Sequence, residues 1–270
     1  MVLRTRGQRD RFTRGVERIS PDRVMKVVGA SAELDFQKAL AIENALAGSR
    51  FTTPKALNCD SHAGRIEFEY VENARSLQEV AEQAYATGAL EGLLEANRAA
   101  GELLAILHSR LTLPDFQHWP VPSFLASDAE LSGRSVFADQ EVFLHCDFSP
   151  VNVLVKNDGH IVLIDASPNT YFTEHANLMG PRFVDIATYT VKLHWPYRWR
   201  TFRLKWRQVI DRLRGEFLDS YAQSSGVVVD RTLLRAFERA AVRSFVNWKT
   251  RSPLIRLPAM AVSRWGLPAY

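Results

Sequence analysis

Apolar residues recur along the chain with two different spacings, and each spacing predicts one kind of element. Residues 23–28 (RVMKVV) follow a Pro-Asp turn, and residues 66–71 (IEFEYV) alternate polar with apolar side chains, so both segments are predicted strands. Between them, residues 31–47 repeat apolar side chains every three to four positions, which predicts a helix with Ser31 as its N-cap. The expected apolar stripe of this helix is Phe36, Ala39, Leu40, Leu46 and Ala47.

The rest of the chain is mainly helical in pattern. Residues 76–111 keep the helical period except near Thr87 and Gly88, where we expect a break between two helices. Residues 113–139 contain Pro, Ser and Trp without a clear period, so we expect a lid or a packed surface loop. Two amphipathic helices are predicted near the C-terminus, the second beginning at Asp230. Their apolar positions are Trp199, Phe202, Trp206, Ile210, Leu213 and Phe217 in the first, and Leu234, Phe237, Ala241, Phe245 and Trp248 in the second.

The central segment, residues 142–165, reads VFLHCDFSPVNVLVKNDGHIVLID and combines short apolar runs with regularly placed polar residues. The Asn-Asp-Gly turn at residues 157–159 is a strong hairpin signal, and it would fold residues 153–155 back against residues 161–164. Such a hairpin would bring Asn152 and Asp165, which flank its two strands, to the same end.

These polar residues match the needs of phosphoryl transfer to a hydroxyl group. One carboxylate orients the attacking oxygen and takes its proton, while an amide oxygen and a second carboxylate hold the magnesium that neutralises the triphosphate. Asp147 is therefore the candidate catalytic base, and Asn152 and Asp165 are the candidate magnesium ligands.

The same segment resembles the catalytic and metal-binding loops of the protein-kinase-like superfamily, H-x-D-x-x-x-x-N followed by a magnesium-binding Asp. Ser149 stands where protein kinases usually carry Lys, and Ala166-Ser167 follows Asp165 where they carry Phe-Gly. Both features favour the aminoglycoside phosphotransferase and choline kinase-like branch. The resemblance implies an α+β, two-lobed fold with a small, mostly β N-lobe containing one helix (residues 1–72) and a larger, mostly helical C-lobe (residues 73–270). It also implies Mg²⁺ and ATP as phosphoryl donor.

The resemblance extends to nucleotide-binding positions in the N-lobe. Lys26 is the candidate for the strand lysine that contacts the α- and β-phosphates. Its expected partner is a helix carboxylate, and Glu43, seventeen residues later, fits the family spacing, although Glu33 is an alternative. An extended hinge would bind adenine through its main chain. The hinge residues are Tyr70, Val71 and Glu72.

Two further segments of the chain bear on the family resemblance. The N-terminus has no G-x-G-x-x-G, only Gly7 and Gly15 in RGQRDRFTRG, so phosphate binding would fall to arginines or to a short, irregular loop. Downstream, GPRFVDIATYTV places Asp185 where these kinases hold the backbone of the catalytic loop. The closing A-P-E motif of protein kinases is absent, which counts against a protein substrate.

Composition and cysteine content limit the classes of protein to which the chain can belong. The 270 residues are 46% hydrophobic and 24% charged, as in an ordinary globular protein with a full core. Only Cys59 and Cys146 occur, without histidines at metal spacing, so neither a disulfide framework nor a zinc site is indicated. No apolar leader and no run of eighteen apolar residues occurs, so we expect a cytoplasmic protein.

The charge is divided unevenly along the chain. Residues 1–190 carry 18 Lys and Arg against 25 Asp and Glu, whereas residues 191–270 carry 16 against 5, a net charge of +11. Four cations form an i, i+4 row on the last helix, and only Glu238 is near enough on that helix to offset their repulsion. This row is either a solvated basic face or a patch for an anionic substrate or lipid headgroups. Its members are Arg231, Arg235, Arg239 and Arg243.

The sequence therefore predicts a kinase that phosphorylates a hydroxyl of a small molecule. Because aminoglycosides are polycations, the basic C-terminal part favours a neutral or anionic acceptor, such as a sugar or a glycolipid presented at a membrane surface. Nucleic acid is not expected as a partner, since no recognition motif accompanies the charge. The alternatives are a catalytically silent, kinase-like module that binds a nucleotide or a partner and, less favoured, a protein kinase.

Overall fold

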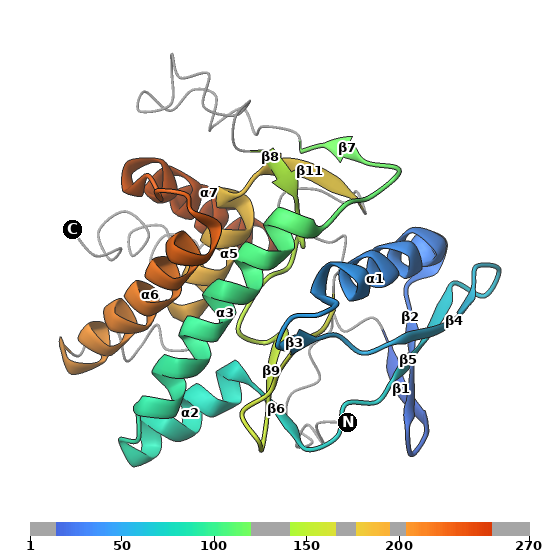
Figure 1. Ribbon diagram of the computed structural model, residues 1–270, viewed down its shortest axis with the longest axis horizontal. Helices are drawn as coiled ribbons and strands as arrows, with labels where there is room; N and C mark the ends of the chain where they lie inside the picture. Colours follow the sequence, from blue (N-terminus) through green and yellow to red (C-terminus); the bar gives the residue numbers. More distant parts are fainter. Residues whose placement is uncertain (1–14, 120–140, 166–176, 195–203, 250–270) are drawn as a thin grey trace.

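The structure is a computed structural model, and it describes residues 15–119, 141–165, 177–194 and 204–249 (Figure 1). An antiparallel sheet with one helix forms the N-terminal part, and a mostly helical region follows, as the resemblance implied. The sheet has the strand order β1-β2-β5-β4. Its strands are β1 (Val16–Ser20), β2 (Arg23–Val27), β4 (Ala56–Asp60) and β5 (Arg65–Glu69).

Helix α1 (Ala32–Leu46) follows a short 3-10 turn, η1 (Gly29–Ser31), and confirms the predicted helix to within a residue at each end. Its buried face is only partly the predicted one: Ala39 and Leu46 are buried, but Ala47 is exposed. Two charged residues, Asp35 and Lys38, are buried on this face. A hydropathy pattern misses such residues because they are buried through polar contacts, which compensate the cost of desolvation.

The predicted hairpin is confirmed. Strand β9 (Val153–Lys156) pairs antiparallel with β10 (Ile161–Leu163), with Val153 opposite Leu163. Gly159 has φ +83°, a left-handed conformation that suits glycine in a tight turn. The hairpin lies in a second sheet with the order β3-β10-β9-β6. The outer strands of this sheet are β3 (Phe51–Thr52) and β6 (Ala74–Ser76).

Five helices of the C-terminal region are described, together with a small sheet. Helix α2 (Leu77–Thr87) begins with a capping box between Ser76 and Glu79 and ends at Gly88, whose φ is +81°. The predicted break is therefore confirmed, and α3 (Glu91–Arg110) follows it. The other helices are α5 (Phe183–His194), α6 (Leu204–Ser225) and α7 (Arg231–Lys249), and the sheet contains β7 (Gln117–His118), β8 (Glu141–Phe143) and β11 (Leu178–Pro181).

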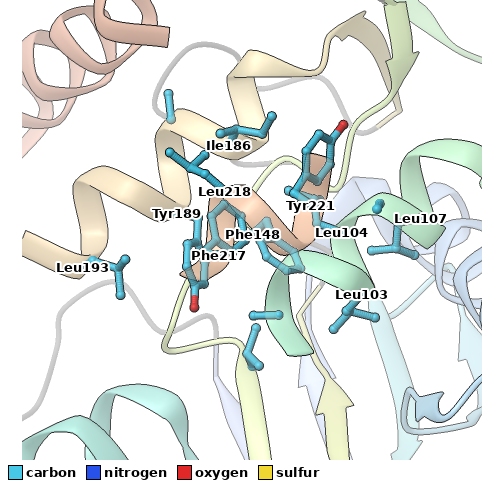
Figure 2. Close-up of a cluster of buried hydrophobic side chains, with 14 of the residues drawn as sticks. Leu103, Leu104, Leu107, Phe148, Ile186, Tyr189, Leu193, Phe217, Leu218 and Tyr221 are labelled. Atoms are coloured by element: carbon cyan, nitrogen blue, oxygen red, sulfur yellow. The ribbon is translucent and has the colours of Figure 1, made fainter. Parts of the chain in front are cut away.

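The core of the helical region supports the loop between β8 and β9. Phe148 of this loop is fully buried, and its ring centroid lies 5.4 Å from that of Tyr189 on α5. Tyr189 stacks in turn on Phe217 of α6, with 4.0 Å between the centroids (Figure 2). A loop whose central side chain is packed in this way has little freedom to move.

Helices α6 and α7 confirm the predicted apolar stripes where side chains are described. The buried positions are Ile210, Leu213, Phe217, Leu234, Phe237 and Ala241. Trp199, Phe202 and most of residues 113–139 lie outside the described residues, as do the side chains of Trp206, Phe245 and Trp248. None of the described helices combines the length and apolar composition needed to cross a membrane.

Glu238, the carboxylate expected to offset part of the repulsion in the arginine row, also has partners on two other helices. Its carboxylate is buried and accepts hydrogen bonds from Arg214 of α6, at 2.8 Å, and from Thr190 of α5, at 2.6 Å. A buried carboxylate is stabilised most by partners that replace its lost hydration. Glu238 therefore links α7 to two other helices.

Candidate active site

The open end of the β9–β10 hairpin gathers the polar residues predicted from the sequence. The Ile164 N–H donates to the Asn152 carbonyl oxygen at 2.9 Å, which aligns the two ends of the hairpin. The Asn152 amide nitrogen donates to the Asp147 backbone oxygen at 2.9 Å and to Asp147 Oδ2 at 3.1 Å. Asp165 forms an ion pair with Lys26 of strand β2. Four of the predicted residues thus lie in one region.

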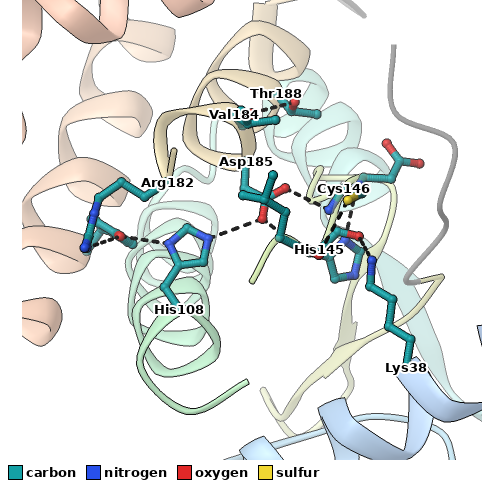
Figure 3. Close-up of polar contacts among 11 residues, drawn as sticks. Lys38, His108, His145, Cys146, Arg182, Val184, Asp185 and Thr188 are labelled. Carbon is teal, nitrogen blue, oxygen red and sulfur yellow. Dashed lines mark hydrogen bonds and ion pairs between the residues drawn. The ribbon is translucent and has the colours of Figure 1, made fainter. Parts of the chain in front are cut away.

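Asp185 holds the backbone of the catalytic loop, here defined as residues 145–152. Its buried carboxylate accepts the His145 N–H at 2.7 Å and the Cys146 N–H at 2.9 Å (Figure 3). Cys146 has φ +77° and Asp165 has φ +58°, which are uncommon conformations for residues other than glycine. The predicted structural role of Asp185 is confirmed by these contacts.

A chain of buried polar groups supports Asp185 from behind. His108 on α3 contacts Asp185 Oδ2 through Nε2 at 3.2 Å and the Tyr221 hydroxyl through Nδ1 at 2.8 Å. Because a carboxylate only accepts, Nε2 carries the proton, and Nδ1 accepts from the hydroxyl of Tyr221. Arg182 donates to that hydroxyl at 3.1 Å. Burial opposes ionisation of Asp185, but the hydrogen bond from His108 and the loop N–H groups lower its pKa overall.

His145 and Asp147 differ in their electrostatic surroundings. His145 is buried, and desolvation lowers its pKa to about 3, so the imidazole is neutral at neutral pH. Its Nδ1 accepts the Asp147 N–H at 3.2 Å. Burial raises the pKa of Asp147, while the ammonium of Lys192 opposes this shift. A carboxyl group tuned upward in this way is suited to accept a proton during a reaction.

Three lysines from three elements surround the loop and the hairpin end. Besides Lys26, which pairs with Asp165, Lys192 of α5 pairs with Asp147. Lys38 of α1 is fully buried and donates to the His145 carbonyl oxygen at 3.0 Å.

The sequence prediction missed Lys38 and Lys192, but each has a positional signal. Lys38 lies between the buried Asp35 and Ile42 at helical spacing, and Lys192 follows Asp185 by two turns of α5.

The hinge residues and Glu43 lie beside a groove of about 800 Å³ that Lys26 and Asp165 do not line. Tyr70, Val71, Glu72 and Glu43 all contribute to its wall. The Tyr70 N–H donates to the carbonyl oxygen of Asp22 at 2.7 Å. Within the described residues, no ion pair joins Lys26 to Glu43 or to Glu33, so the pairing of Lys26 with a helix carboxylate stays a prediction.

The residues at the hairpin end fit a magnesium ion. The Asn152 amide nitrogen donates to two oxygen atoms of Asp147. These bonds distinguish the nitrogen from the oxygen of the amide group and leave Oδ1 available as a metal ligand. The Asp165 carboxylate is 40% exposed despite its pairing with Lys26. No group of three His, Cys, Asp or Glu residues comes together as a metal site in the described ranges. Mg²⁺ takes few protein ligands and completes its shell with phosphate oxygens and water, so one amide oxygen and one carboxylate are a sufficient donor set.

The likeness of this chain to known proteins is found in the fold. No protein-family model matches the chain, and no curated protein sequence matches it either. Solved structures do match. A glucosamine kinase in complex with glucosamine, ADP and inorganic phosphate superposes with a TM-score of 0.63 at 17% identity, over 90% of this chain and 76% of that one.

Two further solved structures resemble the chain. The choline kinase LicA from Streptococcus pneumoniae has a TM-score of 0.57 at 14% identity, covering 94% of this chain and 89% of that one. The macrolide 2'-phosphotransferase MphH from Brachybacterium faecium has a TM-score of 0.50 at 12% identity, covering 95% and 93%. At these identities the likeness concerns the fold. The chain has the aminoglycoside phosphotransferase and choline kinase-like fold.

Proposed function

We propose that the protein is an ATP-dependent phosphotransferase that phosphorylates a hydroxyl group of a small molecule. The observation that carries this proposal is the gathering of Lys26, Asp147, Asn152 and Asp165 at the open end of the hairpin. These four side chains come from three separate parts of the sequence. They are the residue types that phosphoryl transfer requires for phosphate binding, proton acceptance and metal binding.

Asp147 is the catalytic base in this proposal. As the acceptor oxygen attacks the γ-phosphorus of ATP, its proton moves to the Asp147 carboxylate, and the bond to the ADP leaving group breaks. The raised pKa of this carboxyl, caused by burial, supports the assignment because it strengthens the base. The nearby His145 stays neutral and positions the Asp147 backbone.

Asn152 Oδ1 and the Asp165 carboxylate would hold Mg²⁺. The bound ion would neutralise negative charge on the triphosphate and on the group in transfer. Asp165 would then be a metal ligand instead of the partner of Lys26, because the ion and the ammonium group would compete for the same carboxylate. Lys26, once released, would reach the α- and β-phosphates.

The nucleotide would lie between an N-lobe of residues 1–72 and a C-lobe of residues 73–270. Because the Tyr70 N–H already donates to Asp22, adenine would use the Tyr70 carbonyl and the main chain of Val71 and Glu72. Glu43 would take part by pairing with Lys26 in the nucleotide-bound form. ADP in the glucosamine kinase structure supports ATP as the donor.

We further propose a neutral or anionic acceptor of the sugar or glycolipid type. The similar glucosamine kinase supports the sugar type, and the net charge of +11 on residues 191–270 favours an acceptor that is not a polycation. A cytoplasmic enzyme that works at the membrane surface would meet such glycolipids, and its basic C-terminal part would favour an anionic surface.

An acceptor screen tests the function. Wild-type protein, Asp147→Asn and a control, Asp158→Asn at the far turn of the hairpin, are incubated with Mg-ATP. The panel contains sugars, glucosamine, sugar phosphates, glycolipid headgroups and aminoglycosides, and products are identified by mass spectrometry. We expect Asp147→Asn to lower kcat by about 10²–10⁴-fold with little change in the Kd for Mg-ATP, while Asp158→Asn behaves as wild type.

Two other outcomes would change the assignment. Full activity of Asp147→Asn would exclude this residue as the base. Tight binding of Mg-ATP without phosphorylation of any acceptor would favour a catalytically silent nucleotide-binding module.

A further inference from the structure

Helix α5 contacts the catalytic loop at three points along one of its faces. Asp185, in its first turn, accepts the two loop N–H groups described above. Tyr189 packs its ring 5.4 Å from that of Phe148, and Lys192 forms an ion pair with Asp147. Steps of four and three residues place all three side chains on the same face of the helix. One face of α5 therefore contacts the backbone, the central aromatic ring and the candidate base of the loop.

The Asp147 carboxylate is held at both of its oxygen atoms. Lys192 contacts Oδ1, and the Asn152 amide nitrogen donates to Oδ2 at 3.1 Å. The two donors come from α5 and from the loop itself, so they fix the plane of the carboxylate from two directions. Lys192 is only 14% exposed and Asp147 23%, which strengthens their attraction relative to a surface pair.

The catalytic loop supplies no positive charge of its own. Residues 145–152 (HCDFSPVN) contain no Lys or Arg, and His145 is neutral because burial lowers its pKa to about 3. Ser149, which stands where protein kinases usually carry Lys, is buried. A cation that stabilises Asp147 must therefore come from outside the loop, and Lys192 lies in the required place.

We propose that Lys192 is a positioning residue for phosphoryl transfer, whose ammonium holds the Asp147 carboxylate in the orientation that accepts the proton of the acceptor hydroxyl. This inference rests on the proposed function. The new bond joins the acceptor oxygen to the γ-phosphorus, the bond to ADP breaks, and the proton passes to Asp147. Lys192 remains protonated throughout and acts only through Asp147. Misplacement of a reacting group by about 1 Å can cost roughly 10²-fold in rate, so the orientation matters.

The test uses the full chain with the acceptor found in the screen above. The variants are Lys192→Met, Lys192→Gln, Lys192→Arg, Asp147→Asn and the double variant Lys192→Met with Asp147→Asn. Arg98→Met, which removes an exposed, ion-paired cation on α3, is the matched control. We measure kcat, KM and the Kd for Mg-ATP, and check folding by thermal unfolding. We expect Lys192→Met and Lys192→Gln to lower kcat by about 10²-fold with the Kd for Mg-ATP within about twofold of wild type.

Two further expectations separate positioning from a structural role. Lys192→Arg, which keeps the charge, should recover most of kcat. The double variant should be no slower than Asp147→Asn alone, because both changes disable one unit. If Lys192→Met does not fold, Lys192→Gln, which keeps most of the side-chain length and a donor, decides the question.

The outcomes for the inference and for the proposed function are distinct. Wild-type kcat in a folded Lys192→Met or Lys192→Gln variant, beside an inactive Asp147→Asn, would overturn the role of Lys192 alone. Equal losses in kcat and in Mg-ATP affinity, with no recovery in Lys192→Arg, would overturn it as well. Absence of turnover in the wild type, or full activity of Asp147→Asn, would reject the proposed function and this inference together.

Discussion

The Lys38 ammonium, fully buried on α1, donates a hydrogen bond of 3.0 Å to the carbonyl oxygen of His145 in the catalytic loop. This bond joins the single helix of the N-terminal part to the loop that carries the candidate base. We expect Lys38→Met, which keeps most of the side-chain volume, to leave that carbonyl unsatisfied and to lower the free energy of unfolding by about 1–3 kcal/mol. Turnover should fall as well, because the loop loses a support.

Urea unfolding and steady-state kinetics measure both effects. Arg98→Met is the control, because Arg98 is 49% exposed and surface ion pairs such as its own contribute little to stability. Equal unfolding midpoints and equal kcat for Lys38→Met and Arg98→Met would show that the bond contributes nothing.

Lys38 also illustrates what the sequence could predict. The hairpin, the break at Gly88 and the grouping of Asn152 with Asp165 followed from turn chemistry and spacing, which act locally and are visible in the sequence. The burial of Lys38 depends on a carbonyl oxygen 107 positions away, so a hydropathy pattern gives no sign of it.

The same limit applies to ion pairs. Family spacing suggested Glu43 as the partner of Lys26, yet the ion pair in the structure is with Asp165, 139 positions away. Contacts of this kind are decided by tertiary packing rather than by spacing along one element.

Acid should destabilise the protein through its buried histidines. His145 has its pKa lowered to about 3 by burial, and burial also lowers the pKa of His108, whereas an unfolded histidine titrates near 6.5. Between these values the unfolded chain binds protons that the folded chain does not, so stability is lost as the pH falls below about 6.5. His145, whose pKa in the folded protein lies far below this range, contributes a slope of about 1.4 kcal/mol per pH unit.

The free energy of unfolding, measured by urea denaturation between pH 7 and pH 4.5, checks this expectation. In His145→Asn, the side-chain oxygen can still accept the Asp147 N–H. We expect the slope of the unfolding free energy against pH to decrease by the contribution of His145, about 1.4 kcal/mol per pH unit. His62→Asn, in an exposed turn, should keep the wild-type slope. A His145→Asn slope equal to that of wild type would mean that His145 is protonated in the folded state.

The contact between α3 and α6 depends on Gly101. A Cβ atom on this residue would overlap the Phe217 carbonyl oxygen and lie 3.0 Å from the Tyr221 nitrogen. Since backbone atoms cannot move aside cheaply, Gly101→Ala should separate the helices and destabilise the protein by about 1–3 kcal/mol or more. The displaced α6 would also disturb the packing of Phe217 on Tyr189.

Gly92 offers a matched control on the same helix, because no atom lies within 4 Å of its hypothetical Cβ. Gly92→Ala should raise stability by up to about 1 kcal/mol through helix propensity. Thermal unfolding of both variants therefore gives shifts of opposite sign, and a neutral Gly101→Ala would show that the two helices are not tightly packed there.

A double-mutant cycle separates the two candidate partners of Lys26. If the ion pair with Asp165 persists until nucleotide binds, Lys26→Ala and Asp165→Asn should show a non-additive effect on unfolding of the nucleotide-free protein. Lys26→Ala and Glu43→Ala should then be additive without nucleotide. In the presence of Mg-ATP the expected pattern reverses, because in the proposed function Asp165 would be a metal ligand and Lys26 would pair with Glu43.

Calorimetric binding of Mg-ATP adds a second criterion to this cycle. Asp165→Asn should weaken nucleotide binding and abolish most of its magnesium dependence, since it removes a metal ligand. If the Lys26 substitution is additive with the Asp165 and the Glu43 substitution, both with and without nucleotide, neither carboxylate is the partner of Lys26.

The charge of the acceptor provides the last prediction. Residues 191–270 carry 16 Lys and Arg against 5 Asp and Glu, a net charge of +11, and two unit charges about 4 Å apart interact by roughly 4 kcal/mol at an effective dielectric near 20. Several such repulsions would outweigh the hydrogen bonds that a polycation could form, so we expect neutral and anionic sugars to be phosphorylated with a higher kcat/KM than kanamycin-like polycations. Raising the ionic strength should narrow the difference, because salt screens the repulsion. Efficient phosphorylation of polycations at low salt would show that acceptors bind beyond the influence of this basic C-terminal part.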